Sequence, residues 1–193
     1  MRQIEDMILS EGTVLPGGIL KVGSFLNQRI DPGLLKAMAS DVAEKFGDSG
    51  VTKVMTIESS GIALAAAVGM ELAVPIVFVK KHKSSNVDGD VYSIPVHSFT
   101  HGNEYEAVVS KDYLLSSDRV LLVDDFLASG NALTGLVELV RKARAELVGA
   151  AVAIEKRFQG GGDALRDAGI RVYPLACIES MDGDEIKFCD VEV

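Results

Sequence analysis

Short apolar segments alternate along this chain with segments of helical periodicity, and this alternation constrains the fold more than any other feature. The strand-like segments, rich in Val, Ile, Leu and Ala, are 51–57, 75–81, 119–125, 147–156 and 170–178. The helical segments are 63–72, 131–146 and 163–169. Strands that are apolar on both faces and separated by helices are typical of a parallel sheet covered by helices on both faces. The sequence therefore predicts an α/β fold with a central, mostly parallel sheet.

Two regions break this rhythm. Residues 15–32 contain two prolines and several glycines, so we expect an irregular segment lying over the sheet, which we call the hood and place mainly at 12–32. Residues 83–112 are polar and carry two alternating apolar patterns, which predict an antiparallel hairpin with a mobile loop at 97–103. Neither region reads as a linker. A chain of 193 residues can bury roughly 70% of its unfolded surface, so we expect one domain spanning 1–193.

Composition narrows the classes of function. A net charge of -9 argues against general affinity for nucleic acid, because neutralising phosphates needs a basic surface. The charged N-terminus does not resemble a signal peptide, and no segment has the ~20 consecutive apolar residues of a membrane span. Cys177 and Cys189 lack CxxC spacing and lie in or beside apolar stretches, so we expect two buried free thiols rather than a disulfide or a metal site. These features predict a cytoplasmic protein.

The segment RVLLVDDFLASGNAL (119–133) carries the strongest chemical signal. We expect a buried strand whose apolar run stops at Val123 and which ends with Asp124 and Asp125, followed by a loop of small residues and a helix. Ligands of open parallel sheets bind where strands end, and the backbone N–H groups of a helix N-terminus attract anions. Carboxylates accept hydrogen bonds from a sugar diol. The pattern therefore favours a ribose 5-phosphate ligand, and the alternative is that the two acids only cap a turn.

The same segment resembles the phosphoribosyl pyrophosphate (PRPP) signature of type I phosphoribosyltransferases, in which four apolar residues precede two acids and a small-residue turn ending in Gly-Thr. Asn131 stands here where Thr is commonest, and Asn retains a donor and can cap a helix. The resemblance implies the type I phosphoribosyltransferase fold and a PRPP site. Its implied PRPP-binding residues are Asp124, Asp125, Ala128, Ser129, Gly130, Asn131 and Ala132.

Two further segments carry the resemblance over most of the chain. VLPGGILKVGSF (14–25), followed by RIDP (29–32), is similar to the hood of adenine phosphoribosyltransferases. ESSGIALAAAVGMELAVPIVFVKK (58–81) is similar to their pyrophosphate-binding turn, helix and strand, with Ser59 and Ser60 in place of Ala-Arg. The resemblance implies that backbone N–H groups of 58–61 hold pyrophosphate. The alternative, compatible with that role, is a plain helix cap by Ser59 or Ser60.

The purine site is implied by resemblance as well. In the oxopurine members a lysine at the position of Lys156 donates to the purine O6, and an ammonium group, which has no acceptor, disfavours adenine. The backbone of Leu20 and the amide of Asn27 are expected at the purine, Asn27 donating to the 2-oxo group of xanthine. The alternatives are that Lys156 reaches solvent, that Asn27 caps a turn before Asp31, and that Gln28 takes its place. Three aromatic side chains are candidates for contact with the base, although core packing is the default for each: Phe25, Phe126 and Phe158.

A basic cluster at 80–83 is expected either to balance pyrophosphate charge, in this or a neighbouring subunit, or to be a solvated loop. The histidines at 82, 97 and 101 lack metal-ligand spacing with acids or cysteines, and we assign them no chemistry. The resemblance also implies Mg²⁺ bound with PRPP or pyrophosphate, without direct protein ligands, a homodimer, and closure of 83–112 over the site.

Taken together, these segments resemble the bacterial xanthine phosphoribosyltransferases. The expected reaction converts xanthine and PRPP into xanthosine 5-phosphate (XMP) and pyrophosphate, with hypoxanthine and guanine as weaker substrates. One alternative is an adenine phosphoribosyltransferase, favoured by the hood and disfavoured by Lys156. A second is a PRPP-sensing regulator without turnover, and a third is a structural α/β protein without a ligand.

Overall fold

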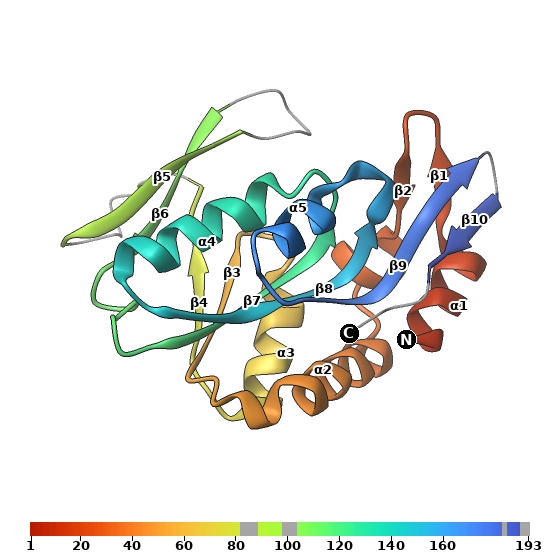
Figure 1. The fold of residues 1–193 in the computed structure, drawn as a ribbon. Coiled ribbons are helices and arrows are strands. Elements are labelled where there is room, and N and C mark those ends of the chain that lie inside the picture. Colours follow the sequence, from red (N-terminus) through yellow and green to blue (C-terminus); the bar gives the residue numbers. More distant parts are fainter. Residues whose placement is uncertain (82–88, 98–103, 183–184, 190–193) are drawn as a thin grey trace.

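The computed structural model describes residues 1–81, 89–97, 104–182 and 185–189 (Figure 1). The helices and helical turns in these residues are α1 (Arg2–Glu11), η1 (Gly23–Asn27), α2 (Pro32–Phe46), η2 (Gly47–Ser49), α3 (Ile62–Leu72), α4 (Asn131–Ala143), η3 (Arg157–Gln159) and α5 (Gly161–Asp167). The strands are β1 (Thr13–Leu15), β2 (Ile19–Lys21), β3 (Lys53–Ile57), β4 (Ile76–Val79), β5 (Val91–His97), β6 (Glu104–Ser110), β7 (Arg119–Leu127), β8 (Glu146–Lys156), β9 (Val172–Asp182) and β10 (Glu185–Phe188).

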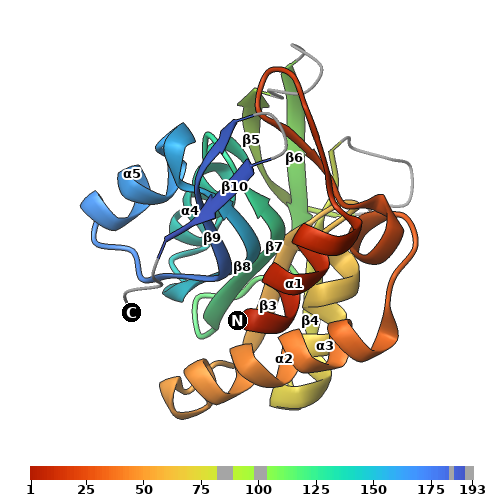
Figure 2. The same cartoon turned by 90° about the vertical axis from the view of Figure 1, so that its right-hand side faces the viewer.

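The central sheet has the strand order β10-β9-β8-β7-β3-β4. Neighbouring strands from β9 to β4 are parallel, and β10 pairs with β9 in the antiparallel sense. Helices α1, α2 and α3 lie on one face of this sheet, and α4 and α5 lie on the other (Figures 1 and 2). The predicted α/β fold with helices on both faces is confirmed.

Alternate residues of each strand divide between two cores. Val54, Leu121 and Val123 pack with α1, α2 and α3, whereas Met55 and Leu122 pack with α4 and the β5–β6 hairpin. Successive strand side chains point to opposite faces, so a strand between two helical layers must be apolar at every position. This is the reason for the near-continuous Val, Ile and Leu runs.

Two helices in the N-terminal part were not predicted. α1 buries Ile4 and Ile8 on one face, and α2 buries a stripe that includes Leu34, Met38 and Val42. Asp31 caps α2 by accepting a hydrogen bond from the Leu34 N–H at 2.8 Å, and Pro32 follows at the first helical position. The Asn27 amide donates to Asp125 at 3.3 Å and not to the backbone of a turn, so the alternative that Asn27 caps a turn before Asp31 is wrong. Within the described residues, no helix is both long and apolar enough to cross a membrane.

The hood is more regular than predicted. It contains an antiparallel hairpin, with Thr13 opposite Lys21 and Leu15 opposite Ile19, followed by the π-helical turn η1. Gly17 and Gly18 have φ angles of 84° and 73°, a conformation that side-chain-bearing residues rarely adopt, and they form the turn between the strands. Gly17 and Gly18, which interrupt the helical and strand patterns in the sequence, thus form part of the turn of a hairpin.

The second hairpin is confirmed in its described part. β5 and β6 are antiparallel, and the two predicted alternating sets face each other, with Ile94 opposite Ala107 and Val96 opposite Tyr105. The hairpin lies over α4 at Gly135, where an added Cβ would meet Ile94 Cδ1 and Val96 Cγ2 at 2.8 Å each. Most of the predicted loop 97–103, and positions 82 and 83 of the basic cluster, lie outside the described residues.

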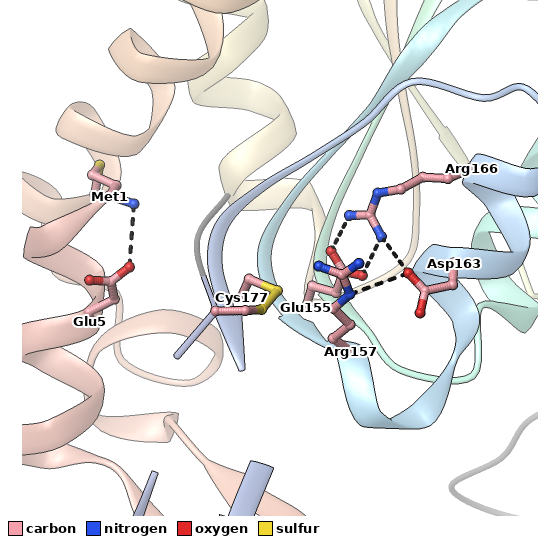
Figure 3. Close-up of a disulfide and its surroundings, with 8 residues drawn as sticks. Met1, Glu5, Glu155, Arg157, Asp163, Arg166 and Cys177 are labelled. Atoms are coloured by element: carbon pink, nitrogen blue, oxygen red, sulfur yellow. Dashed lines mark hydrogen bonds and ion pairs between the residues drawn. A yellow bond between two sulfur atoms is a disulfide. The ribbon is translucent and has the colours of Figure 1, made fainter. Parts of the chain in front are cut away.

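The prediction of two free thiols was wrong. Cys177 in β9 and Cys189 after β10 form a disulfide, with Cα atoms 5.4 Å apart (Figure 3). β10 folds back along β9, so residues separated by 12 positions become neighbours, and the Cys189 N–H donates to the Cys177 carbonyl at 2.9 Å. The β9–β10 hairpin was not predicted, and the disulfide that depends on it was therefore not predicted either.

Candidate active site

The acidic pair lies inside a strand rather than at its end. β7 continues to Leu127, because β8 runs alongside it and pairs with it as far as Leu127 and Glu155. Asp124 and Asp125 are only 5% and 7% exposed. β7 thus runs two residues beyond the predicted segment 119–125, and the alternative that the two acids cap a turn is wrong.

The two carboxylates have different surroundings. Burial raises the pKa of Asp124 well above its usual value, and the negative charge of Asp125 raises it further. The Asp124 Oδ1 accepts the Asp125 N–H at 2.9 Å. Asp125 accepts hydrogen bonds from the Ser60 hydroxyl at 2.9 Å and from the Asn27 amide at 3.3 Å. Two neutral donors therefore contact the Asp125 carboxylate, whereas burial disfavours the charged form of Asp124.

The acidic pair and the small-residue loop line one cavity of about 220 Å³. Gly130 has a φ of 84° and precedes the first turn of α4, so the backbone turns there to open the helix toward the cavity. The cavity brings together every residue predicted to bind PRPP: Asp124, Asp125, Ala128, Ser129, Gly130, Asn131 and Ala132. A helix N-terminus beside two carboxylates can bind a ligand that carries both a phosphate and hydroxyl groups.

The turn after β3 also lines this cavity and contributes Glu58 and Ser60. The Glu58 carboxylate accepts the Lys81 N–H at 2.7 Å, which ties the end of β3 to the end of β4. α3 begins after Gly61 without a side-chain cap, so the suggested cap by Ser59 or Ser60 is wrong. Gly61 is required by space, because an added Cβ would lie 2.4 Å from Thr56 Oγ1 and 2.6 Å from Asp124 Oδ1.

Tyr105 of β6 also lines the cavity, and the sequence predicted it only as a hairpin residue. Burial raises the pKa of its phenol, and the charge of Asp124 adds to the shift. The Lys81 ammonium lies 5.4 Å from the centre of its ring. The sequence places Tyr105 in a polar hairpin that follows a basic cluster. This position does not indicate that the hairpin reaches the acidic pair.

Lys156 ends β8 next to this cavity and is 9% exposed, so the alternative that it reaches solvent is wrong. Its ammonium donates to the Gly18 carbonyl of the hood at 2.8 Å and lies 5.3 Å from the centre of the Phe126 ring. Burial lowers the pKa of Lys156. A buried ammonium with donors to spare is suited to an oxygen acceptor on a ligand.

The other predicted purine contacts lie in the hood. Leu20 is buried in β2 opposite Val14, and Asn27 ends η1 with its amide on Asp125. Leu20, Asn27 and Lys156 do not line the 220 Å³ cavity, so the structure groups the PRPP candidates more tightly than the purine candidates. Among the aromatic candidates, Phe25 is a core residue at 1% exposure, whereas Phe158 is 45% exposed beside Gly18.

Comparison with known proteins agrees with this geometry. Residues 29–166 match the family described as the phosphoribosyl transferase domain. Xanthine phosphoribosyltransferase of Listeria innocua is 46% identical over 100% of both chains, and that of Bifidobacterium animalis subsp. lactis is 49% identical over 95% of this chain and 96% of its own. The crystal structure of an adenine phosphoribosyltransferase from Giardia lamblia complexed with 9-deazaadenine superposes with a TM-score of 0.77, at 24% identity, over 90% of this chain and 97% of the other. The chain thus belongs to the phosphoribosyltransferase family and has the type I phosphoribosyltransferase fold.

Proposed function

We propose that this chain is a xanthine phosphoribosyltransferase, which transfers the 5-phosphoribosyl group from PRPP to xanthine and releases XMP and pyrophosphate. The observation that carries the proposal is the cavity at the end of β7, where two buried carboxylates face a small-residue helix N-terminus, with a buried lysine at the end of the neighbouring strand. Relatives named xanthine phosphoribosyltransferase, 45% to 49% identical over nearly the whole chain, support it.

In this proposal PRPP spans the 220 Å³ cavity. The backbone N–H groups of the loop 128–132 hold the 5-phosphate, helped by the Ser129 hydroxyl, because anions are stabilised at helix N-termini. Asp124 and Asp125 accept from the ribose hydroxyls. The turn of 58–61 holds the departing pyrophosphate. No protein nucleophile is needed, because positioning and charge stabilisation supply the rate enhancement as positive charge develops on the anomeric carbon.

Magnesium fits this site as an ion carried by the substrate. In the described part of the chain, no three His, Cys, Asp or Glu side chains gather around one point. Three carboxylates line the cavity, Glu58, Asp124 and Asp125, and Glu58 already accepts the Lys81 N–H. The ion would be held by oxygens of PRPP and by water, with Asp124 and Asp125 close enough to accept from that water. Such an ion supplies neutralisation of the leaving pyrophosphate.

The purine would lie between Lys156 and the hood. An ammonium group has three donors, so Lys156 can keep its bond to Gly18 and still donate to the O6 of xanthine. A primary amide has two N–H donors, so Asn27 can donate to Asp125 and to the 2-oxo group. The backbone of Leu20 would meet the remaining edge of the ring. These roles favour a 6-oxopurine over adenine.

A homodimer is part of the proposal, as is a cytoplasmic location. The argument for the cytoplasm from free cysteines is lost with the disulfide, so the location follows only from the proposed place of the enzyme in purine salvage.

The proposed function is tested by steady-state pyrophosphate release with PRPP and Mg²⁺, using xanthine, guanine, hypoxanthine and adenine in parallel. We expect xanthine to give the highest kcat/KM. A preference for adenine would contradict the role of Lys156. Binding of PRPP without turnover of any base would instead identify a PRPP-sensing regulator.

A further inference from the structure

A run of three glycines, Gly160–Gly162, lies against the loop proposed to hold the 5-phosphate. The Gly161 N–H donates to the Ala128 carbonyl at 3.1 Å. An added Cβ on Gly161 would lie 2.3 Å from that oxygen and 2.4 Å from the Gly130 nitrogen, both of them backbone atoms. An added Cβ on Gly130 would in turn lie 3.1 Å from Gly161 Cα. Two backbone segments therefore touch here, and a side chain on Gly161 would have to displace the loop.

An ion pair between the buried Glu155 and the partly exposed Arg166 lies against the glycine run. The Glu155 side chain is fully buried, and the Arg166 guanidinium of α5 donates to its two oxygens at 2.8 and 2.6 Å (Figure 3). An added Cβ on Gly162 would lie 1.8 Å from Glu155 Oε1, so the backbone of the run packs directly on the carboxylate. A bidentate pair of this kind has a fixed geometry, and the hydrogen bond to Glu155 is the main cause that raises the pKa of Arg166.

Glu155, which holds the glycine run, and Lys156, the proposed purine contact, are consecutive residues. Glu155 and Lys156 end β8, and side chains of adjacent strand residues point to opposite faces of the sheet. Lys156 reaches Gly18 of the hood, and Glu155 reaches Arg166. The short segment from Lys156 to Gly161 therefore connects the proposed purine end of the nucleotide to its proposed phosphate end.

We propose that the Gly160–Gly162 run, held by the Glu155–Arg166 pair, sets the position of the 5-phosphate loop relative to Lys156, and that Glu155, Gly161, Gly162 and Arg166 are positioning residues for the nucleotide. The inference rests on the proposed function, because it takes the loop 128–132 as the 5-phosphate site. A ligand held at both ends loses alignment when one end is displaced, and small displacements of this kind cost large factors in binding and rate.

Gly161→Ala tests the proposal through two ligands that report on different parts of the site. The dissociation constants of ribose 5-phosphate and of pyrophosphate are measured by titration calorimetry with Mg²⁺. We expect ribose 5-phosphate to bind at least about tenfold more weakly, because the added methyl displaces the loop. Pyrophosphate should change less than about twofold, because its proposed turn at 58–61 is untouched. In the control Gly47→Ala, the added Cβ meets nothing within 4 Å, and both constants should stay the same.

The double variant Glu155→Leu with Arg166→Leu tests the role of the Glu155–Arg166 pair. It also tests the positioning proposal if Gly161→Ala does not fold. Replacing Glu155 and Arg166 together leaves no unpaired charge in the interior, so the fold should survive, as circular dichroism would show. Asp163, which also accepts from Arg166, is half exposed and keeps its ion pair with Arg157. We expect the same selective loss of ribose 5-phosphate. Folded variants that bind this ligand as tightly as the wild type would overturn the proposal. A wild-type protein that binds neither ligand would overturn the proposed function first, and the positioning roles with it.

Discussion

At the scale of single residues, the two adjacent acids are the most unusual feature of the chain. Asp124 is buried next to Asp125, and burial together with that neighbouring charge raises its pKa, so folding disfavours its ionised form. Between the ordinary carboxyl pKa and this raised value the native state binds more protons than the unfolded state. The stability of the ligand-free protein therefore falls as the pH rises through that window.

Asp124→Asn removes the unfavourable buried charge, and it also removes a proposed contact with the ribose. We expect the ligand-free variant to unfold at least about 2 °C higher than the wild type at neutral pH, with the difference shrinking toward pH 4. Its kcat/KM should fall on the order of 100-fold. Scanning calorimetry across pH and initial-rate kinetics measure the two effects. The exposed Asp48→Asn serves as the control, and a variant that is no more stable than wild type would refute the charge argument.

Asn27 has two proposed partners, and only one of them depends on the base. Asn27→Ala should lower kcat/KM for xanthine by roughly tenfold more than for hypoxanthine, which lacks the 2-oxo group. Loss of the bond to Asp125 affects both substrates equally, so the ratio of the two rates isolates the contact with the base. Equal losses for the two bases would assign Asn27 to Asp125 alone.

The residues of the candidate site could be predicted from the sequence where they are neighbours in the chain. The acidic pair and the loop 128–132 form one motif, and Lys156 ends a recognisable strand. The bonds from Ser60 and Asn27 to Asp125 join positions 65 and 98 residues apart, and Tyr105 reaches the cavity from a separate hairpin. Such contacts leave no local pattern, so they require the three-dimensional structure.

At the scale of elements, strands were predicted better than helices. A strand buried on both faces is a continuous apolar run, whereas α1 and α2 show only a stripe of apolar positions among charged ones. β7 exceeds its predicted end because pairing with β8 satisfies its backbone beyond the two acids. The tertiary neighbour, and not the local polarity, decides where this strand ends.

The disulfide closes the β9–β10 hairpin, and we predict that it stabilises the protein against thermal unfolding. Cross-linking residues 12 positions apart restricts the unfolded chain and is worth about 3 kcal/mol. Adding a thiol reductant should therefore lower the midpoint of thermal unfolding by roughly 6–12 °C. The double variant Cys177→Ala with Cys189→Ala should be insensitive to the reductant. A wild-type midpoint that does not respond would show that the two thiols are unpaired in solution.

At the scale of the whole molecule, the sheet order explains why distant segments share one site. β3, β7 and β8 are parallel neighbours, so their carboxyl ends meet at one edge, where the turn of 58–61, the acidic pair and Lys156 come together. This convergence could be predicted because parallel strands leave little choice of edge. The strand order and the contact of the glycine run with the phosphate loop could not, because both depend on long-range packing.

The proposed homodimer belongs to this scale as well. Light scattering coupled to size-exclusion chromatography should give a mass twice the 20.5 kDa of the chain. The closed two-fold dimer is the commonest assembly of identical chains. A mass of one chain at micromolar concentration would contradict the proposal.

We propose that this site transfers phosphoribosyl groups to a 6-oxopurine that Lys156 recognises. The most direct test measures kcat/KM for xanthine and for adenine in the wild type and in Lys156→Met, which keeps an unbranched side chain and removes the donor. We predict that the wild type prefers xanthine by at least about 100-fold, and that the variant loses most of this preference through a lower rate with xanthine. A wild-type preference for adenine, or a variant that discriminates as well as the wild type, would contradict the account.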